Sequence, residues 1–576
     1  MFNRMMPERV LHFTPEGKVA MFEMFGGSNL FEVLTGEIDV MAKTTAAMEM
    51  FGMDPDHLLD VLLRDAARLD ALDPDVRASG AHKNIEGKVE RQKDHFNYMM
   101  YGVRMLDQNA AAINNATRSL LMGQLLGGQL FSMVADKGTM VAAALNNGQS
   151  PLGQVFAGTL ALSKGNRDFA RRNGLMIGHI LNAANRWGYE RLEGLTGKAE
   201  TTQRVGQALQ RLSLGPVVTE AYKTAAASSV YDLFGSLAEK HNALADMHPS
   251  DRKYFKSYGL SETDFSIFRE AEKESVFGYG KTMLTPNAIM KLDDGIIAQH
   301  TGLKTDAAVR RYKQRLAEKY QAAVYTEVST AVVEGGVKEK FLLGKANEAG
   351  SASGEVGRWL AMLKTFPFSW MTTMYERAYK ADFAKPLGRT QYVATLVPAL
   401  LVFSALGTWM RDLANGRNPT SFNPEDEAFA GNVGRLVVQS GGMGVLGDLL
   451  FADYSRTDSS MGTYISGPGA KVAEDIFSMT IGNVQDAWAG KDTNIEKELL
   501  KFARQWTPGS RLFYTRAIMD RMIWNQIEET IDPGGAQKRA DRMVEKYGMS
   551  REWWGADELL PEEAPDLTTV FEAQDR

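Results

Sequence analysis

The sequence predicts a mostly α-helical protein, multi-helical and elongated, with glycine-rich loops in its C-terminal third and one conditionally membrane-inserting helix. Apolar residues recur at helical spacing through most of the 576-residue chain. Runs with the alternating pattern of a β-strand are rare and short. Cysteine is absent, so disulfides, thiolate metal sites and cysteine nucleophiles are excluded.

The clearest amphipathic helix is predicted within residues 54–81. It begins after Asp54-Pro55 and ends near Asp73-Pro74, because proline is tolerated in the first turn of a helix and disfavoured further along. Its apolar residues form one stripe at helical spacing: Leu58, Leu59, Leu62, Leu63, Ala66, Leu69 and Leu72.

Three further helices have recognisable signals in the middle of the chain. Ser261, with Asp264 three residues later, resembles a capping box. Thr285 followed by Pro286 predicts another helix start, and Asp306–Tyr325 has the length and pattern of a long helix.

Composition divides the chain into four regions. Residues 1–200 are predicted to form an N-terminal helical region, 201–345 a helical middle region, 346–548 a C-terminal module and 549–576 an acidic tail, which is typical of an extended or disordered docking segment. The first region has two charge-free runs rich in Gly, Ala, Leu and Met, Ser119–Ala135 and Gly138–Ser163. Such runs suit either an oligomer interface or a buried helical hairpin.

The most informative segment is Thr390–Met410, 21 residues without a charge between Arg389 and Arg411. A helix of this length spans roughly 30 Å, the thickness of the bilayer core. Proline and the hydroxyl residues offset much of its apolar character, so we expect it to enter a membrane only under some conditions. A buried core helix bent at Pro398 is the alternative. The residues predicted to insert are Tyr392, Leu396, Pro398, Leu400, Leu401, Val402, Phe403, Leu406 and Trp409.

The overall charge and hydropathy limit the classes of function. A formal net charge of −6 argues against non-specific coating of nucleic acid. The mean hydropathy is negative, which argues against a protein with many membrane spans. One basic stripe, Arg311, Arg315 and Lys319, is a candidate for nucleic-acid contact, with Tyr312 or Tyr320 available to stack on bases; a solvated helix face is the alternative.

The motifs of enzymes are not found. The eight histidines lack metal-ligand spacing. The stretch Gly278–Thr282 is similar to a phosphate-binding loop, but Ser275 stands where the first glycine is required and the residues before it are expected to be helical. We therefore expect no catalytic, cofactor or metal site.

Several segments of the C-terminal third occur in a recognisable order. Gly354-Glu355 with Arg358, followed by Lys364, Phe366 and Pro367, is similar to the signature GE..R...QFKSFP, in which Met362, Leu363 and Thr365 stand here for Gln, Phe and Ser. Further segments follow in the sequence: RDLANGRNP (411–419), QSGGMGVLGDLLFADYSR (439–456), SGPG (466–469) and WTPGSRLFYTRAIMDR (506–521). Over roughly residues 340–560 the chain resembles the C-terminal module of the large internal virion proteins of short-tailed bacteriophages.

This resemblance implies a protein that is stored in the virion interior and ejected with or ahead of the DNA. Such proteins reassemble in the periplasm and inner membrane of the host as a conduit for the genome. The implied partners are further copies of the chain, other internal virion proteins, the portal and tail, the host membrane, and phage DNA passing transiently through a lumen. No cofactor is implied.

Two alternatives remain open. One is a murein-degrading or polyvalent phage enzyme whose active site has no recognisable motif. The other is a soluble virion scaffold or DNA-organising protein, for which the apolar helix 390–410 would stay buried in every state.

Overall fold

The fold is mostly α-helical, as the sequence predicts. The computed structural model describes residues 14, 16–17, 30–72, 74, 85–101, 103, 106–125, 129–147, 149, 164–173, 202, 205–206, 208–210, 212–276, 280–343, 348–362, 364–380, 388–426, 429–439, 495–510, 512–547, 550–556 and 558–570.

The chain divides into two units, each assembled from separate stretches of sequence. Unit 1 comprises Met1–Ala116, Ile177–Thr201 and Gly336–Ala361. Its described helices are α3 (Leu30–Phe51), α4 (Pro55–Asp70), α6 (Ile85–Tyr101), the first half of α7 (Gln108–Leu125), α19 (Val337–Leu342) and α20 (Ala352–Leu360). Stacked His95 and Phe341 rings and the edge contact of Phe51 with Phe96 join these helices.

Unit 2 comprises Thr117–Met176, Thr202–Gly335 and Met362–Arg576. The first group of its described elements is α8 (Gln129–Asn146), α10 (Lys164–Arg172), α13 (Gly215–Lys240), α14 (Pro249–Ser257), α15 (Glu262–Glu270), β1 (Glu274–Val276), β2 (Gly280–Met283), α16 (Pro286–Lys291), α17 (Asp294–Thr301) and α18 (Asp306–Ala331). The second group is α21 (Thr365–Lys380), α22 (Gly388–Ala414), α23 (Phe429–Gln439), α28 (Ile495–Trp506), α29 (Arg516–Met519), the π-helix η6 (Asp520–Trp524), α30 (Asn525–Ile531) and α31 (Gly535–Tyr547).

The helix starts predicted from local signals are confirmed. Ser261 and Asp264 form a reciprocal capping box, in which the Asp264 amide donates to the Ser261 hydroxyl and the Ser261 amide donates to the Asp264 carboxylate. The Thr285 hydroxyl accepts from the Ala288 amide at the start of α16. Helix α18 begins at the predicted Asp306 and continues to Ala331, six residues beyond the predicted end.

The leucine stripe of α4 is largely exposed. The helix begins where predicted, with Asp54 accepting from the His57 amide, and ends at Asp70. Of the stripe, Leu58, Leu62, Leu69 and Leu72 are exposed, Leu69 by 68%. The periodicity thus predicts the helix correctly, but it does not predict whether other parts of the chain bury its apolar stripe.

A short hairpin lies where the sequence analysis expects helix. Strands β1 and β2 pair antiparallel, with Glu274 opposite Met283. The prediction that Arg269–Ser275 is helical is therefore correct only for Arg269 and Glu270, which end α15, and is wrong for Glu274 and Ser275, which lie in β1. The amide and hydroxyl of Thr282 both donate to the Asp232 carboxylate on α13, which anchors β2 to that helix.

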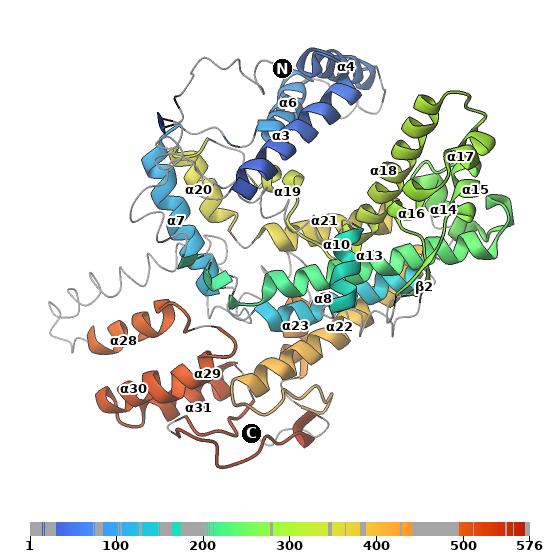
Figure 1. The fold of residues 1–576 in the computed structure, drawn as a ribbon. Helices are drawn as coiled ribbons and strands as arrows, with labels where there is room; N and C mark the ends of the chain where they lie inside the picture. Colours follow the sequence, from blue (N-terminus) through green and yellow to red (C-terminus); the bar gives the residue numbers. More distant parts are fainter. Residues whose placement is uncertain are drawn as a thin grey trace. The chain divides into compact units, whose positions relative to one another are not determined.

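The main core of unit 2 lies around α13 and α18 (Figure 1). Tyr231, Phe234, Phe255 and Tyr320 are fully buried and meet through tilted and edge-to-face ring contacts. The hydroxyl of Tyr320 donates to the Leu284 carbonyl, so its polar end is satisfied inside the core.

A buried ion pair joins α18 to α21. Arg377 donates to both oxygens of the Glu327 carboxylate, at 2.9 and 3.1 Å, and the Tyr258 hydroxyl donates to the same carboxylate at 2.5 Å. Burial disfavours the charged form of Glu327, but the charge and hydrogen bonds of Arg377, with those of Tyr258 and Asn147, outweigh it and lower the pKa of this carboxyl.

Removing one partner of this pair should destabilise the protein more than removing both charges. We expect Arg377→Met to lower the free energy of unfolding by about 3–5 kcal/mol, because Glu327 is left buried without a counter-charge. Adding Glu327→Gln to that variant should restore part of the loss. Urea unfolding of the two variants measures the difference, and equal destabilisation would contradict a tightly coupled pair.

Glu220 on α13 should make stability depend on pH. Burial raises the pKa of this carboxyl to about 7; Lys223 lowers it and Glu334 raises it further. Because the folded-state pKa lies above the unfolded one, the stabilisation is complete below the unfolded pKa and is lost as pH rises through about 7. Glu220→Gln should therefore raise the melting temperature at pH 8 and have little effect at pH 4. A gain of equal size at both values would show that this titration does not govern stability.

Candidate functional site

The candidate site is α22, which contains the charge-free segment. Its most apolar window, within Tyr392–Ala414, has a mean hydropathy of 1.8 and is 39% buried. Within the part of the chain that the structure describes, it is the one helix long and apolar enough to cross a membrane.

One row of α22 residues, spaced by four, is buried. Tyr392, Leu396 and Leu400 are each exposed by no more than 5%, and Ser404 and Thr408 continue the row. Ala142, Val333, Trp370 and Met374 surround its first half. The Tyr392 hydroxyl lies 3.3 Å from the Met374 sulfur.

A second row, two residues further along and so about 200° around the helix, is exposed. It consists of Ala394, Pro398, Val402, Leu406 and Met410. Val402 is 58% exposed, and Val393 and Val397 beside the row are each 47% exposed. The C-terminal half of the segment therefore turns Ser404 and Thr408 inward and its aliphatic side chains outward. A core helix of a soluble protein has the opposite arrangement.

The buried row packs against α8, and the two ribbons lie side by side in Figure 1. The helices run antiparallel, because the earlier residue of α8, Phe131, meets the later residue of α22, Gly407. Gly138 of α8 approaches the backbone of Leu400, and Gly407 of α22 approaches the carbonyl of Phe131. A Cβ atom added at Gly407 would lie 2.4 Å from that carbonyl oxygen. Small residues at both contacts let the backbones meet closely, as they do between membrane helices.

Pro398 lies inside α22 without ending it. Proline has no amide hydrogen, so the carbonyl of Ala394 has no helical donor. Both residues belong to the exposed row. The interrupted position thus faces away from α8, where solvent can satisfy the carbonyl.

The C-terminal end of α22 is fixed by the following loop. The Asp412 carboxylate accepts from the amide and the hydroxyl of Thr420, and the Trp409 indole donates to the Thr420 carbonyl. Gly416, at φ +75°, makes the turn that ends the helix.

The described part of the acidic tail lies along this loop. The Trp553 amide donates to the Gly416 carbonyl and its indole to the Arg417 carbonyl. The Asp566 amide donates to the Asn418 side chain. The tail thus lies against the segment that follows α22.

The structure separates the residues predicted to insert into two sets. Tyr392, Leu396, Leu400 and Phe403 are buried, Leu401 and Trp409 are partly buried, and Pro398, Val402 and Leu406 are exposed. Val393, Val397 and Met410 are exposed apolar residues that the predicted set omits. The predicted set thus combines residues from both faces of α22, because the sequence alone carries no information on which face packs against α8.

The basic stripe on α18 is only partly open. Arg311 and Arg315 are exposed, whereas Lys319 forms a 3.0 Å ion pair with Asp264. The Tyr312 hydroxyl donates to the same carboxylate, and Tyr320 is buried in the core. In this structure Tyr320 is not available to stack on a base.

The residues that carry the phage resemblance organise the start of α20. The Ser351 hydroxyl caps the helix by accepting from the Gly354 amide. Glu355 is buried, accepts from the Gly350 amide and pairs with Arg358 at 3.0 Å. Of the later segments, residues 440–456 and 466–469 lie outside the described residues.

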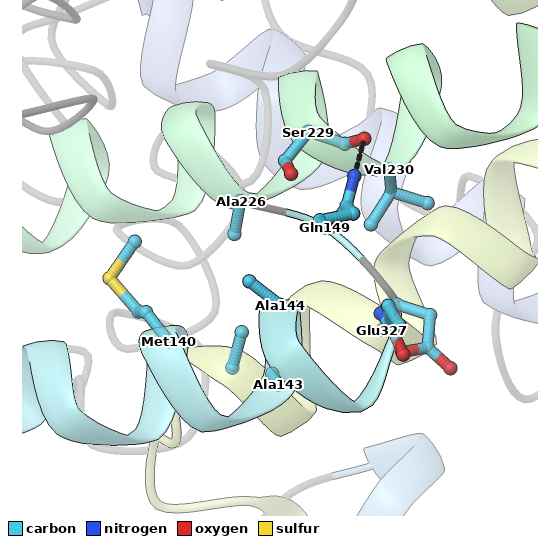
Figure 2. A pocket seen from close by; sticks show the side chains of 10 residues that line it. Met140, Ala143, Ala144, Gln149, Ala226, Ser229, Val230 and Glu327 are labelled. Atoms are coloured by element: carbon cyan, nitrogen blue, oxygen red, sulfur yellow. Dashed lines mark hydrogen bonds between the residues drawn. The ribbon is translucent and has the colours of Figure 1, made fainter. Parts of the chain in front are cut away.

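A small cavity lies between α8, α13 and α18 (Figure 2). Its volume is about 20 Å³, room for one water molecule. Met140, Ala143, Ala226 and Glu327 are among its lining residues, and Gln149 donates to the Ser229 carbonyl beside it. No cluster of three or more potential metal ligands occurs among the described residues.

Comparison with known proteins gives no relative: no family model matches the chain, and no curated protein or solved structure is significantly similar to it. The geometry of α22 is therefore the main evidence on function.

The glycine contacts between α8 and α22 can be tested by adding one methyl group. We expect Gly407→Ala to lower the free energy of unfolding by about 1–3 kcal/mol, because the backbone of Phe131 must move. Gly165→Ala on α10 is the matched control, since a Cβ atom there meets nothing within 4 Å. It should leave stability unchanged or raise it slightly. Thermal unfolding of both variants measures the contrast, and similar melting temperatures would argue against close packing at Gly407.

Proposed function

We propose that this chain is an internal virion protein of a short-tailed bacteriophage that assists delivery of the genome across the host envelope. Copies assemble as a core in the virion interior and, after ejection, as a membrane-associated channel in the periplasm and inner membrane. The role is structural, with no cofactor. The order of C-terminal segments similar to that family supports the phage assignment.

The observation that carries the membrane role is the polarity of α22. In its C-terminal half the buried row consists of the hydroxyl residues Ser404 and Thr408, whereas the exposed row consists of the aliphatic residues Val402, Leu406 and Met410. In water this arrangement leaves apolar surface unburied, and each large aliphatic side chain gains about 1.5–3 kcal/mol on full burial. In lipid the same arrangement is favourable, because helices there associate through small residues and present aliphatic side chains to the acyl chains.

Storage and insertion then differ in what covers the exposed row. In the virion, neighbouring subunits bury Val402 and its neighbours; in the host, the membrane does. The two states share the contact between α8 and α22. A modest difference in free energy between them suffices for a protein that has to be both packaged and inserted.

Two further surfaces support an assembly. The exposed leucine stripe of α4 offers each subunit an apolar contact for another copy, for other internal virion proteins or for the portal and tail. Arg311 and Arg315 offer exposed positive charge for transient contact with DNA in a lumen.

The alternatives have less support. A murein-degrading or polyvalent enzyme needs catalytic residues, and the sequence contains no recognisable catalytic motif. A soluble scaffold or DNA-organising protein remains the stronger alternative, in which the exposed row of α22 only ever contacts protein.

Leakage of dye from phosphatidylcholine vesicles tests membrane entry. We expect the wild-type chain to release the dye and Val402→Asp to reduce the rate at least tenfold, because a carboxylate at this depth costs about 2.5–3.5 kcal/mol. Since Val402 is exposed, the substitution should leave the fold intact.

Val356→Asp is the matched control, with a valine that is 57% exposed on α20. It should leak like the wild type. Two outcomes would contradict membrane entry: the wild-type chain releases no dye, or Val402→Asp changes the size of the oligomer and leaves the leakage unchanged. In either case α22 is a protein interface, and the soluble scaffold is favoured.

A further inference from the structure

Two arginines converge just beyond the C-terminal end of α22. Arg417 lies in the loop after the helix, and Arg521 comes from the π-helix η6, a local irregularity frequent at functional sites. Between them lies the Glu552 carboxylate of the tail, 3.7 Å from Arg417 Nε and 3.6 Å from the terminal nitrogen Nη2 of Arg521. A well-fitted pair of this kind measures about 2.7–2.9 Å. Arg521 Nη2 donates to the Trp554 carbonyl at 2.8 Å instead, so the carboxylate is held only loosely by the two arginines.

The same place holds buried donors without acceptors. Arg521 Nε and Trp554 Nε1 are buried there without a hydrogen-bond partner, and so is Trp524 Nε1, three residues after Arg521 in η6. The Arg521 side chain is only 4% exposed, and its guanidinium stacks on the Trp554 ring at 4.3 Å. Unsatisfied buried groups are rare in native proteins, and here all three are N–H donors. Such a set fits an anion with several oxygen atoms better than a single carboxylate.

The position in the chain indicates which anion. Arg417 follows the end of α22 by three residues, and the Trp553 and Trp409 indoles donate to the carbonyls of Arg417 and Thr420 in the same loop. In a helix that spans a membrane, tryptophan and arginine at this level meet the phospholipid headgroups.

We propose that Arg417 and Arg521 bind the phosphate of an anionic phospholipid headgroup, and that Glu552 occupies this site in its absence. The proposal rests on the proposed function, because it needs α22 at a membrane. A phosphodiester carries the same single negative charge as the carboxylate, so the exchange preserves the charge balance around Arg521.

The exchange needs only a side-chain rotation. The side chains of Arg417 and Glu552 are 18% and 19% exposed, so the carboxylate reaches the surface. The backbone bridge between these two residues and the hydrogen bond from the Trp553 amide to the Gly416 carbonyl can stay in place. The phosphate then takes over from Glu552 as partner of both arginines.

Binding of the full chain to two kinds of vesicle tests this site. Phosphatidylcholine vesicles are compared with vesicles that also contain phosphatidylglycerol, by co-flotation. Glu552→Gln removes the internal competitor and should tighten binding to the phosphatidylglycerol vesicles about fivefold, whereas Arg521→Gln should weaken it about fivefold. Misfolding cannot explain a gain, so the Glu552 variant keeps the test informative if Arg521→Gln does not fold.

Glu563→Gln is the control, because it changes the net charge equally at an exposed position of the same tail segment. Equal tightening by Glu552→Gln and Glu563→Gln would overturn the proposal. So would a Glu552 effect confined to inorganic phosphate, which indicates a free anion, or to a single-stranded oligonucleotide, which indicates nucleic acid.

These results are separable from the test of α22 insertion. If α22 does not insert, Val402→Asp and wild type release dye from phosphatidylcholine vesicles alike, while the preference of Glu552→Gln for phosphatidylglycerol persists. If insertion occurs without the headgroup site, Val402→Asp lowers leakage and the Glu552 preference is absent.

Discussion

The close antiparallel contact of α8 with α22 is the constraint on which the arrangement of the candidate site depends. Glycine at both crossing points, Gly138 and Gly407, brings backbone against backbone and fixes which row of α22 is buried. That choice turns Ser404 and Thr408 inward and leaves Val402 and Leu406 outside. At Gly407 the contact is between backbones, so this part of it can persist when the surrounding solvent changes.

Local signals predicted much of the fold. Caps at Ser261 and Thr285 depend on a few neighbouring residues, and a sequence shows these directly. The hairpin at Glu274–Val276 was missed because its pairing with β2 and the anchoring of Thr282 to Asp232 override the helical preference of the strand. The exposure of the α4 stripe could not be predicted, because periodicity shows that one face of a helix is apolar and does not show what packs against that face.

The sequence predicts where the apolar segment of the candidate site begins and ends, but not which of its residues are exposed. A charge-free run bounded by arginines is visible in the sequence, whereas its partner α8 lies more than 240 residues earlier. The inward position of Tyr392 and the outward position of Met410 follow from that pairing. The convergence of Arg417, Arg521 and Glu552 likewise joins three distant stretches, and no spacing rule relates them.

Pro398 has a consequence for how deep α22 can lie in a bilayer. The carbonyl of Ala394 lacks its helical N–H donor, and the hydrocarbon of the bilayer offers no other donor. Ala394 comes four residues after Thr390, about 6 Å along the helix axis, and this places the carbonyl close to the hydrated headgroup layer when Tyr392 marks the interface. The proline thereby limits the depth of insertion. Moving Ala394 to the bilayer centre raises the free energy of insertion unless that side of the helix borders water.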